Sequence, residues 1–169
     1  AMSIRPIILL GAFAASLAAC APTPGPYGTV QPAAFRADDF AWSQKAGQGG
    51  IEGRVAFTQD GKSYACVGSA GLTPDTPYTR ARFRTLYGST ERAVVPAAVV
   101  RARDVGEAGA DYRAYVRSET CDGGRFSFSD LPDGGWFLIV PVRAQGDEGP
   151  MVLMRHVTTR GGRVVSVTL

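Results

Sequence analysis

Few side chains in this sequence have the types and spacing that catalysis or metal binding requires. His156 is the one histidine among 169 residues, and no Gly-x-Ser-x-Gly motif accompanies it, although a hydrolase needs a nucleophile and an orienting acid beside its base. Cys66 and Cys121 lack further ligands at zinc spacing, and the aspartates of the turns lack the spacing of a calcium loop. No phosphate-binding glycine loop is present either. We therefore expect no catalytic residue, no metal and no cofactor.

The N-terminal residues indicate export and lipidation. Arg5 precedes an uncharged, mostly apolar run over residues 6–19, which is too short to span a bilayer as a helix and is typical of a secretory signal peptide. Leu17-Ala18-Ala19-Cys20 resembles the bacterial lipobox, in which small residues precede a cysteine that is lipidated and becomes the new N-terminus. The resemblance implies a signal peptide over residues 1–19 and a membrane anchor of palmitate and other acyl chains on Cys20. Since Ala21, and not aspartate, follows the cysteine, similarity to enterobacterial sorting implies the outer membrane, on either of its faces.

Export also bears on the two cysteines that remain. Cys66 and Cys121 make an even pair in a compartment that permits disulfides. The expected bridge would close a long loop and stabilise the fold by up to about 4 kcal/mol. Two buried free thiols are the alternative.

Three arginines at alternate positions are the best candidates for a partner-binding surface. As a strand, the segment would place Arg80, Arg82 and Arg84 on one face, whereas a helix over Pro77–Tyr87 would scatter them, and the apolar spacing fits both. We expect this segment to contact an envelope protein, with merely solvated arginines as the alternative. The net charge of +3, with basic and acidic residues interspersed, argues against a nucleic-acid partner.

The elements that must position these residues begin after a tether. Residues 20–50 contain four prolines and no hydrophobic period, which is typical of an extended, flexible tether. Phe35, Phe40 and Trp42 are too many aromatic residues for a pure spacer. We expect this part to dock on the domain as an edge strand or covering loop, and the alternative is a partner-binding peptide.

Residues 51–169 have the pattern of short strands separated by turns. Arg125–Ser129 alternates strictly between polar and apolar, and Asp60-Gly61, Gly123-Gly124 and Gly161-Gly162 are turn or hairpin signals. Seven or so strands at this spacing predict an all-β, seven-stranded Greek-key sandwich. The expected strands cover residues 51–57, 63–67, 94–104, 112–120, 125–129, 136–142, 151–158 and 163–169.

The segment from Gly124 to Val140, GRFSFSDLPDGGWFLIV, is similar to the central signature of carboxypeptidase-regulatory-like domains. Those domains are prealbumin-like sandwiches, and the resemblance covers residues 51–169 apart from a longer connection over 65–88. It implies that Phe126 and Phe128 fill the core between two sheets and that Gly134 or Gly135 takes a positive φ in a turn. It also implies an accessory role, because the family's domain accompanies a catalytic domain and has no active site of its own.

Two functions are compatible with these features. We expect a non-catalytic outer-membrane lipoprotein, held through Cys20, that acts as a structural or protein-binding accessory in the cell envelope. The alternative is a carbohydrate-binding module, which would present a flat row of exposed rings, whereas scattered or buried rings would favour the accessory. An envelope enzyme would require His156 exposed in a cleft beside a serine or an aspartate. The candidate rings are Trp42, Tyr78, Tyr87, Tyr112 and Tyr115.

Overall fold

The computed structural model describes residues 33–104, 106, 110–146 and 149–169, so the expected signal peptide and Cys20 lie outside it. No helix among these residues is long and apolar enough to cross a membrane. The elements in chain order are η1 (Ala37–Gln44), β1 (Gly49–Arg54), β2 (Thr58–Gln59), β3 (Lys62–Cys66), β4 (Ser69–Pro74), α1 (Pro77–Tyr87), β5 (Arg92–Pro96), α2 (Ala97–Arg103), η2 (Tyr112–Tyr115), β6 (Arg117–Thr120), β7 (Arg125–Leu131), β8 (Gly134–Ala144), β9 (Met151–Thr159) and β10 (Val164–Thr168).

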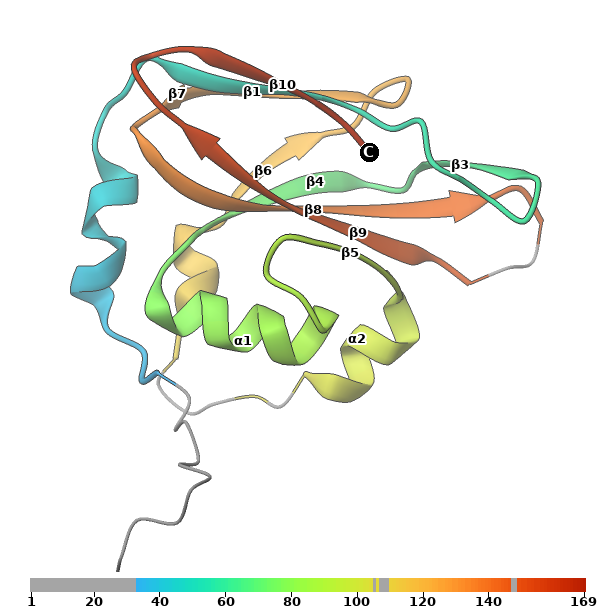
Figure 1. The fold of residues 1–169 in the computed structure, drawn as a ribbon, viewed down its shortest axis with the longest axis horizontal. Coiled ribbons are helices and arrows are strands. Elements are labelled where there is room, and N and C mark those ends of the chain that lie inside the picture. Colours follow the sequence, from blue (N-terminus) through green and yellow to red (C-terminus); the bar gives the residue numbers. More distant parts are fainter. Residues whose placement is uncertain (1–32, 105, 107–109, 147–148) are drawn as a thin grey trace, which may run out of the picture. The chain divides into compact units, whose positions relative to one another are not determined.

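Two sheets pack face to face, as the alternating sequence predicts. The small sheet has the order β10-β1-β7, with β1 parallel to β10 and antiparallel to β7. The large sheet is centred on β8, which pairs with β9 along one edge and with β3 and β4 along the other, while β5 extends it beyond β9 and β6 beyond β4. Figure 1 shows the small sheet lying over one face of the large one. The all-β sandwich is confirmed, but the described residues form three and seven strands instead of seven in total.

The core between the sheets comes from the alternation of the strands. Phe126 and Phe128 of β7 point into it, as the family resemblance implies, and Phe128 lies opposite Ile51 of β1. Leu138 and Val140, at alternate positions of β8, are fully buried on the opposing sheet. Because a side chain's face changes at every residue of a strand, the neighbouring Phe137 and Ile139 lie on the other face of the large sheet.

A layer of helices covers part of that other face (Figure 1). The predicted seven-stranded sandwich has no such layer. The segment 94–104, expected as one strand, is β5 followed by α2, since β5 ends at Pro96, which has no N–H for a ladder. The helix α1 begins with a capping box between Thr76 and Thr79 and ends at Gly88 in the left-handed region. Both end signals are visible in the sequence. They decide for a helix, although the spacing of the apolar residues fits a helix and a strand equally well. Tyr78, Phe83 and Leu86 of α1 and Val152 and Met154 of β9 contribute to this second core.

The segment before β1 belongs to the folded domain and not to the tether. The compact unit includes the described residues before β1, and Phe40 of η1 is fully buried in the second core. Trp42 packs edge-on against Trp136, with ring centroids 4.9 Å apart. A Cβ on Gly134 would lie 2.2 Å from the Trp42 ring, so glycine is required for this close approach. The segment thus docks as a covering 3-10 helix instead of an edge strand.

The turns follow the sequence in part. Asp60 and Gly61 both have positive φ, as a two-residue turn between β2 and β3 requires, so this hairpin is confirmed. Gly161-Gly162 also has positive φ but joins β9 to β10 in the other sheet, so it does not form a hairpin. The expectation that Gly134 or Gly135 has positive φ is wrong, because both belong to β8 and their role is close packing.

The predicted disulfide is present. Cys66 at the end of β3 is bonded to Cys121, with 6.1 Å between their Cα atoms. The backbone N–H of Cys121 donates to the Gly68 carbonyl, 3.3 Å away. The bridge therefore joins the end of β3 to the residue that follows β6.

Candidate functional site

The three alternating arginines do not form the expected common surface. Because the segment is helical, their side chains point in different directions. Arg80 makes an ion pair with Asp75, Arg82 is buried against Asp104, and Arg84 is exposed. The strand-like face on which the partner surface was based is thus absent from this helix.

His156 lies in a mostly buried polar cluster. Its Nε2 is 2.8 Å from Oδ2 of Asp75, whose carboxylate also accepts a hydrogen bond from Nε of Arg80 at 3.1 Å. The side chains of His156 and Asp75 are 16% and 9% exposed. In the described ranges, no serine or other nucleophile has a recorded hydrogen bond to the imidazole. The cluster joins β9 to the short connection between β4 and α1.

The aromatic residues named as possible sugar platforms do not form a flat row. Tyr78, Tyr87 and Tyr112 are buried in the second core. Trp42 lies against Trp136, and Tyr115 stacks on Phe40 with ring centroids 4.6 Å apart. Stacking of a sugar ring on an exposed aromatic face is therefore not what these residues offer.

Two of these tyrosines nevertheless border an open cavity on the outer face of the large sheet. It encloses about 570 Å³ beside α1 and η2. Ile139 and Pro141 of β8 supply apolar surface, and Tyr87 and Tyr112 supply a wall from the helical layer. The hydroxyl-bearing lining residues are Ser69, Thr73, Ser118 and these two tyrosines.

Arg113 is the charged residue at this cavity, and a fixed network orients it. Its Nη2 is 3.3 Å from Oδ2 of Asp104, whose other oxygen pairs with the buried Arg82. Both guanidinium groups lie 5.3 Å from the centroid of the Tyr112 ring, at cation–π distance. The side chain of Arg113 is 62% exposed, against 7% for Arg82. Arg113 can therefore donate hydrogen bonds to a ligand, while Arg82 keeps its partners in place.

Burial and charge set the protonation of the groups behind the cavity. Burial by itself would lower the pKa of Arg82, but a hydrogen bond with Tyr112 and the Asp104 carboxylate outweigh it, and the pKa is raised. Burial also raises the pKa of Tyr87, and Tyr112 and Asp104 add to the effect. Arg82 behind the cavity therefore stays a cation, and Tyr87 in the cavity wall stays a neutral phenol at neutral pH.

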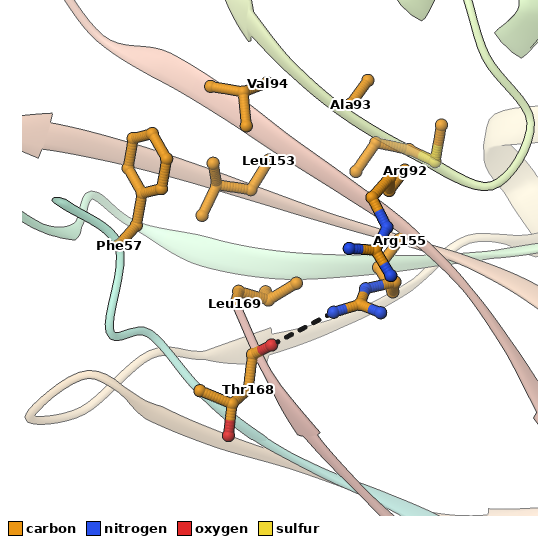
Figure 2. Close-up of a pocket in the computed structure, with 9 residues that line it drawn as sticks. Phe57, Arg92, Ala93, Val94, Leu153, Arg155, Thr168 and Leu169 are labelled. Atoms are coloured by element: carbon orange, nitrogen blue, oxygen red, sulfur yellow. Dashed lines mark hydrogen bonds between the residues drawn. The ribbon is translucent and has the colours of Figure 1, made fainter. Parts of the chain in front are cut away.

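A second hollow of about 350 Å³ opens where β5 and β9 pass the C-terminal part of β10. Figure 2 shows Phe57, Leu153 and Leu169 along this hollow, with Arg92 and Arg155 toward one end. Two cations beside apolar side chains can hold an anionic, partly apolar ligand.

Sequence reasoning missed Arg113 and Asp104 at the first cavity and Arg92 and Arg155 at the second. Tyr112 was named as a possible sugar-binding ring, and its neighbour Arg113 could have been considered with it. No local signal connects Arg92 with Arg155, because their proximity depends on the register between β5 and β9.

The comparisons with known proteins bear on the fold. No protein-family model matches the chain, and no curated protein matches it significantly. A similar solved structure is that of a Pseudomonas aeruginosa protein described as a "putative carbohydrate binding protein", with a TM-score of 0.54 and 23% sequence identity. The similarity covers 80% of this chain and 97% of that one. At this identity the two chains share a fold, and a shared fold does not assign a ligand.

Proposed function

We propose that this chain is a non-catalytic binding protein of the bacterial cell envelope and that its ligand is a carbohydrate. The observation that carries the proposal is the cavity on the outer face of the large sheet, where Arg113 stands at the rim between hydroxyl-bearing and apolar residues. The name of the structurally similar Pseudomonas protein supports the same ligand class.

The lining of the cavity suits the two sides of a sugar. Ile139 and Pro141 offer an apolar surface for the C–H face of a pyranose ring. Ser69, Ser118 and Arg113 offer hydrogen-bonding groups for its hydroxyls. The volume of about 570 Å³ is within the range of small-molecule sites. Tyr87 and Tyr112 border the cavity but form no exposed stacking platform.

The location of the protein is part of the proposal. The lipobox-like Leu17-Ala18-Ala19-Cys20 supports a lipid anchor on Cys20 in the outer membrane, and the signature from Gly124 to Val140 supports membership of the carboxypeptidase-regulatory-like family. We expect Cys20→Ala to abolish palmitate labelling and to leave an unprocessed precursor in cells. Normal labelling of that variant would contradict the anchor.

The ligand class is tested by titrating the purified protein with oligosaccharides from bacterial envelope polysaccharides and from peptidoglycan, using calorimetry. Arg113→Ala is expected to weaken binding about tenfold, because it removes a charged hydrogen-bond donor. Ser118→Trp is expected to block binding by filling the cavity. Arg84→Ala is the matched control, since Arg84 is exposed on α1 and does not line the cavity. Failure of every saccharide to bind, or equal binding by all variants, would contradict the proposal.

A protein-binding accessory is the second candidate function. Most of the candidate aromatic rings are buried, which favours a protein-binding accessory over a sugar-stacking platform. An edge strand of the large sheet offers a surface for a protein partner. That surface lies at β5, away from the carbohydrate cavity.

A further inference from the structure

The strand β5 leaves one edge of the large sheet open. Within the described residues it pairs with β9 alone. The N–H of His156 donates to the Glu91 carbonyl at 2.7 Å, and the N–H of Ala97 donates to the Pro150 carbonyl at 2.9 Å. Along a strand of an antiparallel ladder, the backbone N–H and C=O groups of one residue bond to the partner strand, and those of the next residue point away from it.

This register decides which backbone groups are available. Since the residues before and after β5 at 91 and 97 bond toward β9, the alternate residues Ala93 and Val95 do the same. The N–H and C=O groups of Arg92 and Val94 then point away from β9. The N–H of Arg92 donates to the Ser89 hydroxyl at 3.4 Å, a long and exposed hydrogen bond that an added strand would replace. An extended peptide can pair with them as an added strand.

The side chains of the same two residues border the second hollow. Val94 is 44% exposed, and Phe57, Leu153 and Leu169 continue the apolar surface beside it. Figure 2 shows Val94, Leu153 and Phe57 on one side of the hollow and the two arginines on the other. A strand added to β5 would therefore direct alternate side chains toward this hollow.

The charge of the hollow selects the ligand. Arg92 lies directly opposite Arg155 in the ladder, and like charges in such a pair are destabilising. Arg155 donates from Nη2 to the Thr168 carbonyl at 3.3 Å, a neutral acceptor. Among the recorded ion pairs of the described residues, neither arginine is matched with a carboxylate. A carboxylate from a partner would relieve the repulsion.

We propose that an extended, acidic segment of another protein binds here by adding a strand to β5. Its backbone pairs with Arg92 and Val94, a carboxylate side chain lies between Arg92 and Arg155, and an apolar side chain two residues away enters the hollow. The inference gives the second candidate function a surface and a partner chemistry, and it does not depend on the carbohydrate cavity.

Two other occupants fit the surface less well. A second copy of the chain, paired through its own β5, would add two more arginines to the two that already lie opposite each other. The segment 21–32 of the same chain contains four prolines and no acidic residue. It therefore lacks backbone N–H donors at four positions and has no carboxylate for the two arginines. An acidic strand from a different protein satisfies the backbone and the charge together.

The test uses an acetylated and amidated heptapeptide with threonine at odd positions, glutamate at positions 2 and 6 and leucine at position 4. Binding to the full-length protein is followed by calorimetry and by amide shifts of β5 in NMR spectra. We expect the peptide with glutamine in place of glutamate to bind about tenfold more weakly and the affinity to fall with salt. Equal affinities for the two peptides, or shifts confined to other elements, would overturn the proposal.

Three variants test the protein side. Arg92→Gln and Arg155→Gln are each expected to weaken binding about fivefold. Val94→Pro removes an outward N–H without removing a bond to β9, so it should abolish pairing while the melting temperature changes little. Arg101→Gln, on the exposed end of α2, is the matched control.

Two further outcomes separate this proposal from its rivals. Binding to anionic phosphatidylglycerol vesicles that both arginine variants reduce, with no binding of the peptide, would identify a lipid surface and overturn the peptide proposal. Loss of peptide binding in Val94→Pro with saccharide binding retained would support two separate sites. Arg113→Ala reports on the carbohydrate site, so failure of one proposal is distinguishable from failure of the other.

Discussion

At the scale of the residue, Tyr112 links the second core to the candidate carbohydrate site. Its ring packs near Phe83 and Tyr78 on the inner side. Arg82 and Arg113 both lie at cation–π distance from the same ring. The rigid core therefore holds the position of the exposed Arg113, and preorganised donors bind with a smaller entropic cost than mobile ones.

The raised pKa of Tyr87 predicts a specific response to alkaline pH. The ordinary pKa of tyrosine is 10.0, and burial raises that of Tyr87 in the folded chain. Above about pH 10 the unfolded chain loses a proton that the folded chain keeps, so the free energy of unfolding should fall by about 1.4 kcal/mol per pH unit. Urea unfolding between pH 9 and 11 checks this. In Tyr87→Phe this contribution should be absent, and an identical pH dependence in both proteins would contradict the burial effect.

At the scale of the element, η1 extends the domain beyond the sandwich predicted from strand patterns. Its side chains contact both cores. Phe40 enters the second core, and Trp42 lies against Trp136 and Gly134. Arg117 of β6 also donates to the Ser43 carbonyl at 2.8 Å. The segment is thus an integral part of the fold.

We expect Phe40→Ala to lower the free energy of unfolding by about 3–5 kcal/mol, because it leaves a cavity in place of a fully buried ring. Gln44→Ala, at an exposed position of the same element, should change it by less than about 0.5 kcal/mol. Urea unfolding followed by tryptophan fluorescence measures both. A loss in Phe40→Ala no larger than that of the control would mean that η1 detaches from the sandwich without cost.

At the scale of the whole domain, the two sheets differ in width, and this difference leaves hollows on the large sheet. Three strands of the small sheet cover one face of the seven-stranded sheet only in part, which leaves the hollow beside β5 and β9 open. On the opposite face, the helical layer leaves the cavity over β4 and β8 open. The two hollows to which we assign ligands therefore lie on opposite faces of the large sheet.

The disulfide should stabilise this domain as a whole. Cys66 and Cys121 close a loop with a sequence separation of 55, so Cys66→Ala with Cys121→Ala should lower the free energy of unfolding by up to about 4 kcal/mol. Urea unfolding with and without dithiothreitol measures the effect, and the reductant should not affect the double variant. Equal stability of the oxidised and reduced wild-type protein would show that the bridge contributes nothing.

The sequence by itself determined the features that depend on local pattern or on elimination. Alternation in Arg125–Ser129 predicts a core-facing strand, Asp60-Gly61 predicts a hairpin, and two remaining cysteines can form only one intramolecular bridge. For α1 the deciding signals, the Thr76–Thr79 capping box and Gly88, were also local, although the apolar spacing fitted a strand equally.

Only the tertiary structure decided which distant residues meet. Arg82 is buried against Asp104, and Arg92 lies opposite Arg155, because helix packing and strand register bring together residues that are far apart in the chain. The alternation of a strand tells which residues share a face but not which strand lies beside it. For this reason the sequence indicated a sandwich without cofactor motifs, and the two surfaces that could bind a ligand emerged only from the fold.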